Sequence, residues 1–387
     1  MHVQHVQPGS SVLRALGWDH PRCVSPMLAC AGAWQEQTGM EVEWAWRSLE
    51  SFGDEPLEEL APDYDLLVID HPFCGTAAAS GCLAPLDELV PAPAVAGLAA
   101  DSMGSSHDSY TFCGHQWALA VDAACQVTAV RDDLLGGAAI ATWDDVLALA
   151  RARPGAVALP LAPAHSISSW LTLVANAGAP AAQGSELVVP ETGEWAVALL
   201  AELFSLGPAE AVGWEPPDAL ARLTGTDDLA CVPLTYGFVT YATPGSVERP
   251  CRFVDIPSAG SGPIGSVLGG TGLAVSSTSQ RPDDAAAFAA WACGAEAQCR
   301  LVAPAGGQPA SRTAWHDATV DADAGCFYSG TRATIAAAWV RPREAWWPGF
   351  QLAAGRLLTD ALAAGAPSAG TFRQLDDLYR TSVGGGS

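Results

Sequence analysis

Apolar and polar positions along the first part of the chain alternate between strand-type and helix-type patterns. VLRAL at 12–16 predicts a short buried strand. Ser25-Pro26 predicts a helix start, and the following segment MLACAGAWQEQT predicts a helix that ends at Gly39. MEVEWAW at 40–46 alternates as a second strand, and after another short helical stretch LLVI at 66–69 predicts a strand buried on both faces. This order predicts an open parallel α/β sheet.

Chemically versatile side chains follow the predicted strands. Ligands of open α/β sheets bind beyond the carboxyl ends of the strands. We therefore predict a ligand site there, although an Asp after a strand also commonly caps a helix or forms a turn. The candidates are Trp18, Asp19, His20, Arg47, Asp70 and His71.

The remaining chain predicts a second α/β unit followed by helices. WALAVDAACQVTAV at 117–130 indicates two strand-like runs around Asp122, and Thr142 is a candidate helix N-cap. We expect strands at 156–163 and 229–236, helices at 168–177 and 194–206, a glycine-rich entry into a strand at 263–276, and a helix from 282 to about 301. Beyond it the chain is mostly helical to 380. Crossings near 120–122 and 267–272 then divide the chain into lobe 1 (11–121), lobe 2 (122–267), a return to lobe 1 with C-terminal helices (268–380) and a flexible tail (381–387).

Charge and composition exclude several classes of function. Forty-two acidic residues against 18 basic ones give a net charge of −24, which disfavours nucleic acids and anionic membranes as partners. The basic residues are all arginine, so Schiff-base and phosphate-loop lysines are excluded. No apolar run is long enough to predict a membrane span. The 11 cysteines are an odd number without C-x-x-C spacing, which favours small buried thiols over a zinc site or a complete set of disulfides. The N-terminal segment lacks the pattern of a secretory signal.

Catalytic and cofactor motifs are weak in this sequence. The segment GSVLGGTG at 265–272 precedes a strand and lacks a lysine, so a hinge or a close backbone approach is favoured over phosphate binding. No G-x-S-x-G elbow is present, and no helical histidine pair indicates a metal. We predict no cofactor and no metal. A carboxylate-dependent hydrolase that uses Asp19 and Asp70 remains an alternative.

Tryptophan is abundant, with 14 residues, several of them in predicted loops. An indole ring presents a flat apolar face that stacks on the C–H face of a sugar. Core packing is the competing interpretation, and it is favoured for tryptophans in helical patterns. Trp18 is the leading candidate for ligand contact.

Several segments together resemble one family. TGMEVEW (38–44), YDLLVIDHPFCG (64–75), CLAPLDELV (82–90), WALAVDAACQVTAVRDDLL (117–135), TWDDVLALA (142–150) and GGTGLAVSSTSQRPDDAAAFAAWAC (269–293) are similar in order and spacing to extracellular solute-binding proteins of ABC importers, of the carbohydrate-binding type. The resemblance extends over about residues 11–380.

The resemblance implies a two-lobed periplasmic-binding-protein-like fold (type II), with mostly parallel sheets flanked by helices and a ligand cleft between hinged lobes. It implies a non-enzymatic monomer that closes on a small polar solute, a sugar or polyol, at the extracellular or periplasmic face and docks onto an ABC permease. A cytoplasmic ligand sensor on the same fold is the alternative. The positions that the resemblance places at cleft-facing loops or crossings are Trp18, Asp19, Asp70, His71, Asp122, Tyr236, Gly269 and Gly270.

Overall fold

The computed structural model describes residues 12–365 and 369–385. Its strands are β1 (Val12–Trp18), β2 (Glu41–Arg47), β3 (Leu66–Ile69), β4 (Leu83–Ala84), β5 (Thr111–Phe112), β6 (His115–Gln116), β7 (Leu119–Val130), β8 (Cys231–Tyr236), β9 (Arg252–Val254) and β10 (Leu268–Ser276).

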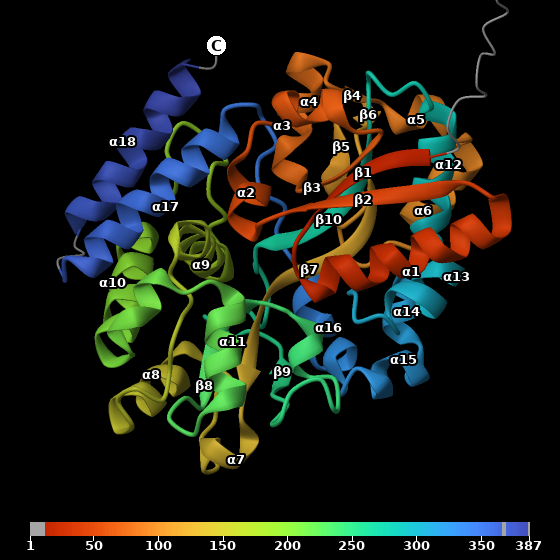
Figure 1. Ribbon diagram of the computed structural model, residues 1–387. Coiled ribbons are helices and arrows are strands. Elements are labelled where there is room, and N and C mark those ends of the chain that lie inside the picture. The colour runs from red at the N-terminus through yellow and green to blue at the C-terminus, as the bar shows by residue number, and fades with distance from the viewer. Residues whose placement is uncertain (1–11, 366–368, 386–387) are drawn as a thin grey trace, which may run out of the picture.

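Helices surround these strands (Figure 1). The α-helices are α1 (Pro21–Thr38), α2 (Leu49–Asp54), α3 (Leu57–Leu60), α4 (Cys74–Ser80), α5 (Leu86–Leu89), α6 (Ala92–Ala100), α7 (Asp132–Leu135), α8 (Trp143–Ala152), α9 (Pro163–Asn176), α10 (Pro190–Leu206), α11 (Pro216–Gly225), α12 (Pro282–Ala292), α13 (Ala295–Ala297), α14 (Arg312–His316), α15 (Ala318–Asp323), α16 (Phe327–Ala336), α17 (Trp347–Ala363) and α18 (Ala369–Gly385). Short 3₁₀ turns are η1 (Ala61–Asp63), η2 (His71–Phe73), η3 (Asp108–Tyr110), η4 (Ala209–Gly213) and η5 (Val239–Tyr241), and a π-helical turn is η6 (Gln298–Val302).

One sheet runs through the molecule in the order β2-β1-β3-β10-β7-β8, with β4 against β10 and β9 against β7. β1 pairs in parallel with β2 and β3, which confirms the predicted parallel unit. β10 pairs antiparallel with β3, β4 and β7, and β7 pairs antiparallel with β8 and β9. Among the described strands, parallel pairing is therefore confined to β1, β2 and β3, and helical segments connect these three in sequence.

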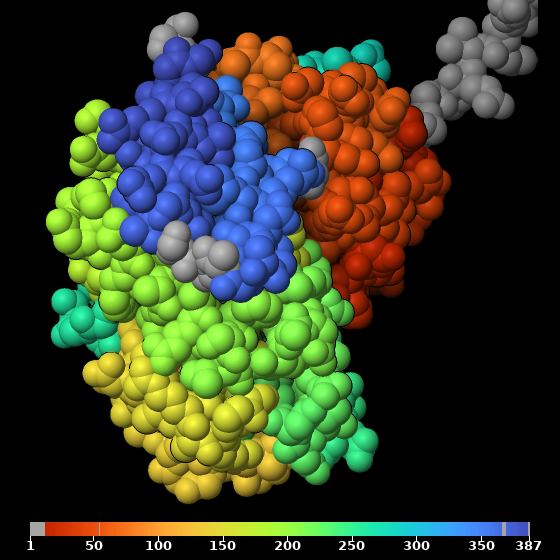
Figure 2. Space-filling model, turned by 90° about the vertical axis from the view of Figure 1, so that its left-hand side faces the viewer, coloured from red at the N-terminus to blue at the C-terminus, as the bar shows by residue number. Residues whose placement is uncertain are grey.

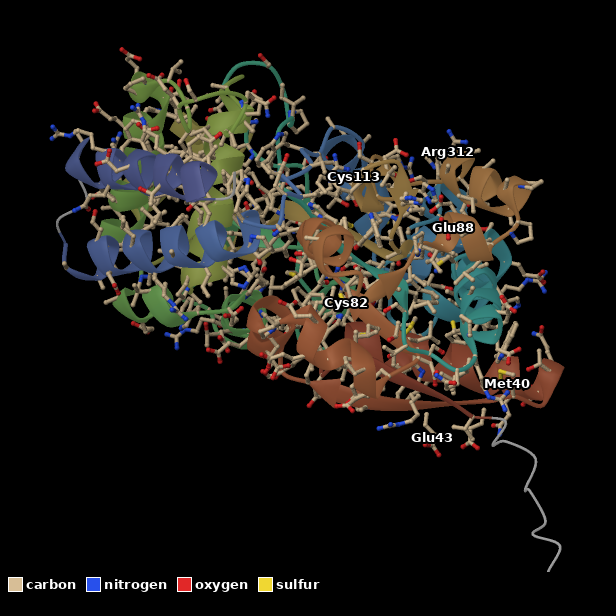
Figure 3. The ribbon with its side chains drawn as sticks, turned by 90° about the horizontal axis from the view of Figure 1, so that it is seen from above. Met40, Glu43, Cys82, Glu88, Cys113 and Arg312 are labelled. Atoms are coloured by element: carbon tan, nitrogen blue, oxygen red, sulfur yellow. The ribbon has the colours of Figure 1, made fainter. Side chains whose placement is uncertain are left out.

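Among the described strands, β2 forms an edge of this sheet, with a pairing partner on one side only. Its residues Glu41 and Glu43 are exposed. Figure 3 shows the Glu43 side chain pointing away from the protein. Charged side chains on an edge strand oppose pairing with another chain.

Two hydrophobic cores define two lobes. We call lobe 1 the part around the first core, to which β1, β3, α1, the first half of β7 and α12 contribute. Lobe 2 is the part around the second core, to which α8, α9 and α10 contribute. The chain after 267 returns to the first core as far as Ile335, whereas α17 and α18 pack into the second. Figure 2 shows these C-terminal helices, in blue, against the yellow-green segment of lobe 2 and bordering the orange segment of lobe 1.

β7 links the two lobes. Its residues from Leu119 to Cys125 pair with β10, and those from Gln126 onward pair with β8 and β9. The sequence predicted two short strands here, but the structure has one continuous strand. Every residue of β7 is buried, since packing on both faces removes the need for a polar break.

Several predicted element boundaries are confirmed by local chemistry. Gly39 ends α1 with φ of 75°, a left-handed conformation that favours glycine. Thr142 caps α8 in a capping box with Asp145. The helix that the sequence placed at 194–206 begins at Pro190, and the helix placed at 168–177 begins at Pro163. Proline at the first helical position fits both starts.

Other boundary predictions are wrong. α1 begins at Pro21 instead of Pro26, because the His20 side chain accepts a hydrogen bond from the Arg22 backbone N–H and caps the helix earlier. Residues 156–163 form no strand but a buried segment with one bridge, between Val157 and Cys231. α12 ends at Ala292, and α13 continues after a break at Gly294.

The C-terminal tail prediction is wrong for residues 381–385, since α18 continues through Gly385. The Oγ1 of Thr381 donates to the Asp377 carbonyl oxygen, and the Oγ of Ser382 donates to that of Leu378. These bonds follow the helix repeat, so the helix extends into the polar end of the chain. The expectation of no N-terminal signal falls on residues 1–11, outside the described residues.

Candidate functional site

A cavity of about 240 Å³ lies between the two lobes. Lobe 1 lines it with side chains such as Trp18, Phe52 and Asp70, from β1, α2 and the turn after β3. Lobe 2 lines it from α9 and α17, with His165, Ser168 and Gln351 among others, and Glu215 at the start of α11 also lines it. The crossing strands supply the floor. Carboxyl ends of parallel strands thus point into the cavity, as the topology predicted.

Five of the candidate residues line this cavity. They are Trp18, Asp70, Tyr236, Gly269 and Gly270. They come from β1, the turn after β3, β8 and β10, so residues far apart in the sequence meet around one cavity. They stay in the site that we propose.

The other five candidates lie outside the cavity lining. Asp19 is exposed to solvent. His20 caps α1 and stacks on Trp18, with ring centroids 5.5 Å apart. The guanidinium of Arg47 lies over the Phe52 ring and 3.7 Å from the Glu55 carboxylate. These positions support the walls, so we do not propose them as ligand contacts.

His71 and Asp122 also act behind the cavity surface. His71 is fully buried, with its ring edge against Tyr110. Burial, followed by the nearby Arg341 charge, lowers the pKa of His71 to about 4, so the ring is neutral at pH 7. Asp122 is buried in an ion pair with Arg22, a residue that lines the cavity.

Arg22 connects α1 with β7 and with the segment after β8 at the cavity floor. Its Nε donates to Asp122 Oδ2 at 2.9 Å, and its Nη1 donates to the carbonyl oxygen of Gly237 at 2.7 Å. The guanidinium also lies 5.0 Å from the Phe238 ring centroid. A buried, fully paired arginine of this kind fixes the floor but brings no unbalanced charge to it.

Trp18 forms the aromatic side of the lobe 1 wall. It is 3% exposed and contacts the rings of Phe52 and Phe238, at centroid distances of 6.1 and 6.2 Å. Tyr236 is half-buried on the lobe 2 side, and its hydroxyl donates to Ser168 Oγ at 3.4 Å. The cavity therefore has apolar ring surfaces on both lobes, the type of surface on which sugar C–H faces pack.

Asp70 is held by two donors. Its Oδ1 accepts from the His71 backbone N–H at 2.8 Å, and its Oδ2 accepts from Arg341 Nη2 at 2.6 Å. Burial alone would raise the pKa of Asp70, but Arg341 and His71 hold it well below its ordinary value. The carboxylate is thus an anionic acceptor at the cavity surface at any physiological pH.

A second hydrogen-bonded pair of cavity-lining side chains is His165 with Glu215. His165 Nε2 contacts Glu215 Oε2 in a short hydrogen bond. Burial would raise the pKa of Glu215, but this contact lowers it below its ordinary value. Glu215 is the N-cap residue of α11, and its backbone N–H donates to Asp218 Oδ2 at 2.9 Å.

The glycines of β10 allow close approach at the floor. A Cβ at Gly269 would stand 2.6 Å from Cε1 of Tyr236, and one at Gly270 would stand 2.3 Å from the Asp122 carbonyl oxygen. Gly270 also has φ of 96°. The expected close backbone approach of this glycine-rich segment is confirmed.

Sequence reasoning missed the residues that form ion pairs and hydrogen bonds with the candidate residues or line the cavity beside them. Arg22 was hidden because the helix was expected to begin after it. Arg341 lies in an irregular proline-flanked segment, RPREAWW, whose pattern carries no sign of a partner near residue 70. A faint signal was available for Glu215, which precedes Pro-Pro at a helix start, but none for His165.

The sequence model of the bacterial extracellular solute-binding proteins matches residues 35–327. The chain belongs to this family. No curated protein matches it. Within the described residues, no helix is long and apolar enough to cross a membrane.

Solved structures of solute-binding proteins have the same fold. One from Thermotoga lettingae, bound to α-D-tagatose, is 16% identical with a TM-score of 0.82, and the match covers 97% of this chain and 100% of that one. One from Agrobacterium vitis with bound D-mannitol is 18% identical with a TM-score of 0.78, over 97% and 98% of the two chains. The cyclic α-maltosyl-1,6-maltose binding protein from Arthrobacter globiformis is 17% identical with a TM-score of 0.75, over 97% and 99%. The chain therefore has the two-lobed periplasmic-binding-protein fold.

Proposed function

We propose that this protein binds a small, neutral, polyhydroxylated solute, a monosaccharide or sugar alcohol, in the cavity between its lobes. The observation that carries the proposal is one cavity with aromatic surfaces on both lobes and polar groups between them. Related folds with bound tagatose and mannitol support the same class of solute.

The charges around the cavity support a neutral solute. Arg22 is paired with Asp122 and Arg341 with Asp70, so both buried arginines of the lining are compensated by the protein. Glu50 and Arg356, which also line the cavity, are exposed to solvent and opposite in charge. A sugar acid or amino sugar would bring an unbalanced charge into this site at a desolvation cost.

The cavity size supports a single sugar unit. Its volume of about 240 Å³ is below the roughly 300–1,000 Å³ typical of sites for drug-sized ligands. A hexose or a linear polyol suits this volume better than a long oligosaccharide.

We also propose that the protein works without chemically changing the solute, as a monomer outside the cytoplasm, and passes the solute to an ABC permease. Membership of the extracellular solute-binding family supports this role. The hydrolase alternative loses support because Asp19 is exposed and lies outside the cavity lining that contains Asp70.

A thermal-shift screen with calorimetry tests the proposal. The set contains D-tagatose, ribitol and D-mannitol, with D-gluconate, D-glucosamine and amino acids as charged counterparts. At about a hundredfold excess over Kd, a bound solute adds about 2.7 kcal/mol of stability. We expect a neutral member to bind and to be recovered intact. Binding confined to charged members, or conversion of the solute, would contradict the proposal.

A further inference from the structure

Arg341 holds one polar group from each lobe. Its side chain is 3% exposed. Nη2 donates to Oδ2 of Asp70 in lobe 1 at 2.6 Å, and Nη1 donates to Oε1 of Gln351 in lobe 2 at 3.0 Å. The planar guanidinium therefore holds the carboxylate and the amide side by side in a defined orientation.

The orientation of the Gln351 amide is fixed by its oxygen. Oε1 accepts a second hydrogen bond, from Trp347 Nε1 at 3.2 Å. With both donors on the oxygen, the amide NH₂ must occupy the other position. Gln351 is half-buried and lines the cavity, and across residues 12–365 and 369–385 its Nε2 has no hydrogen-bond partner. It is an available donor.

Asp70 supplies the complementary group. Its side chain is 20% exposed and lines the same cavity. Each carboxylate oxygen takes one protein donor, the His71 N–H or Arg341, so lone pairs remain for a solute. Lobe 1 thus presents an acceptor and lobe 2 a donor on either side of one arginine.

We propose that Asp70 and Gln351, oriented by Arg341, bind two adjacent hydroxyl groups of the solute: the carboxylate accepts from one hydroxyl and the amide donates to the other. This inference rests on the proposed function and names the atoms that would select for a vicinal diol. Arg341 is the positioning residue. Since one contact lies on each lobe, a diol would join the lobes, whereas a solute with a single hydroxyl would engage only one.

The test uses Gln351→Glu. The introduced carboxylate keeps acceptors for Arg341 and Trp347 but removes the amide donor. Calorimetric titration with D-mannitol, ribitol and D-tagatose compares this variant with wild type and with Gln37→Glu, an equal charge change at an exposed position of α1. Monodeoxy analogues of the tightest-binding probe are then titrated into all three proteins.

We expect Gln351→Glu to weaken binding at least tenfold at pH 7.5, because a carboxylate beside Arg341 stays ionised and has no proton to donate to a solute hydroxyl. We expect wild type to lose affinity for one deoxy analogue by a factor that shrinks in the variant. Gln37→Glu should match wild type throughout. If wild type binds and every analogue loses the same factor in each protein, the inference is overturned and the proposed function stands. A wild type that binds none of the three probes overturns both.

Discussion

Gly269 lies directly against the ring of Tyr236, so close that a Cβ at Gly269 would stand 2.6 Å from Cε1 of that ring. Because glycine at 269 has no side chain, the Tyr236 ring can lie directly on the backbone of the cavity floor. Any residue larger than glycine at 269 must displace the ring.

We expect Gly269→Ala to weaken solute binding about tenfold, or about 1.4 kcal/mol, while the protein remains folded at a cost of about 1–3 kcal/mol. Calorimetry and urea denaturation measure the two effects. Gly32→Ala is the matched control, because a Cβ at Gly32 in α1 meets nothing within 4 Å. Unchanged affinity in Gly269→Ala would mean that Tyr236 does not contact the solute.

The ring of Trp18 can be tested separately from its N–H. Its Nε1 has no hydrogen-bond partner within the described part of the chain, so Trp18→Phe removes ring area without breaking a bond. We expect Trp18→Ala to weaken binding by about 1–3 kcal/mol and to lower stability by about 3–5 kcal/mol, since the residue is also packed in the core. Trp18→Phe should retain most of the affinity for the solute and most of the stability. If Trp18→Ala leaves the affinity unchanged, Trp18 serves only core packing and does not contact the solute.

Asp70 lines the cavity and also has a structural role, as the ion-pair partner of Arg341. Removing its carboxylate leaves Arg341 buried without its ion-pair partner. We therefore expect Asp70→Ala to destabilise the protein by about 3–5 kcal/mol. The double variant Asp70→Ala/Arg341→Met should lose less than the sum of the single variants, which a double-mutant cycle by urea denaturation measures. Additive losses would argue against a coupled pair.

His71 makes stability depend on pH. Burial and then Arg341 lower its pKa in the folded state from 6.5 to about 4. The unfolded chain therefore binds more protons than the folded protein between these values. Stability is full above pH 6.5 and falls as the pH drops toward 4, by about 3 kcal/mol from this residue.

Denaturation midpoints between pH 7.5 and 4.5 check this dependence. We expect His71→Leu to reduce the slope of the curve in that window, while the part due to His20, whose pKa burial and then Arg22 lower to about 4, remains. His316→Gln, a change at an exposed histidine, should leave its slope intact. A curve of the same slope in His71→Leu and wild type would mean that other groups control the acid response.

Local patterns sufficed for the elements that begin the fold and for part of the site. The apolar runs at 12–16 and 66–69 are strands whose ends carry Trp18 and Asp70. These predictions hold because a buried strand and its end can be recognised from neighbouring residues in the sequence. The ion pairs cannot be recognised in this way. Asp70 and Arg341 are joined across 271 positions, and Arg22 and Asp122 across 100, so only the folded topology makes them partners.

The crossing strands also determine how the chain folds during synthesis. β3 and β7 both require β10 as a neighbour, yet β10 is made after α7 to α11, β8 and β9. Until it emerges, a growing chain exposes two unpaired apolar strand edges, which are templates for aggregation. A chain cut before residue 268 lacks the strand that joins β3 to β7 in the sheet.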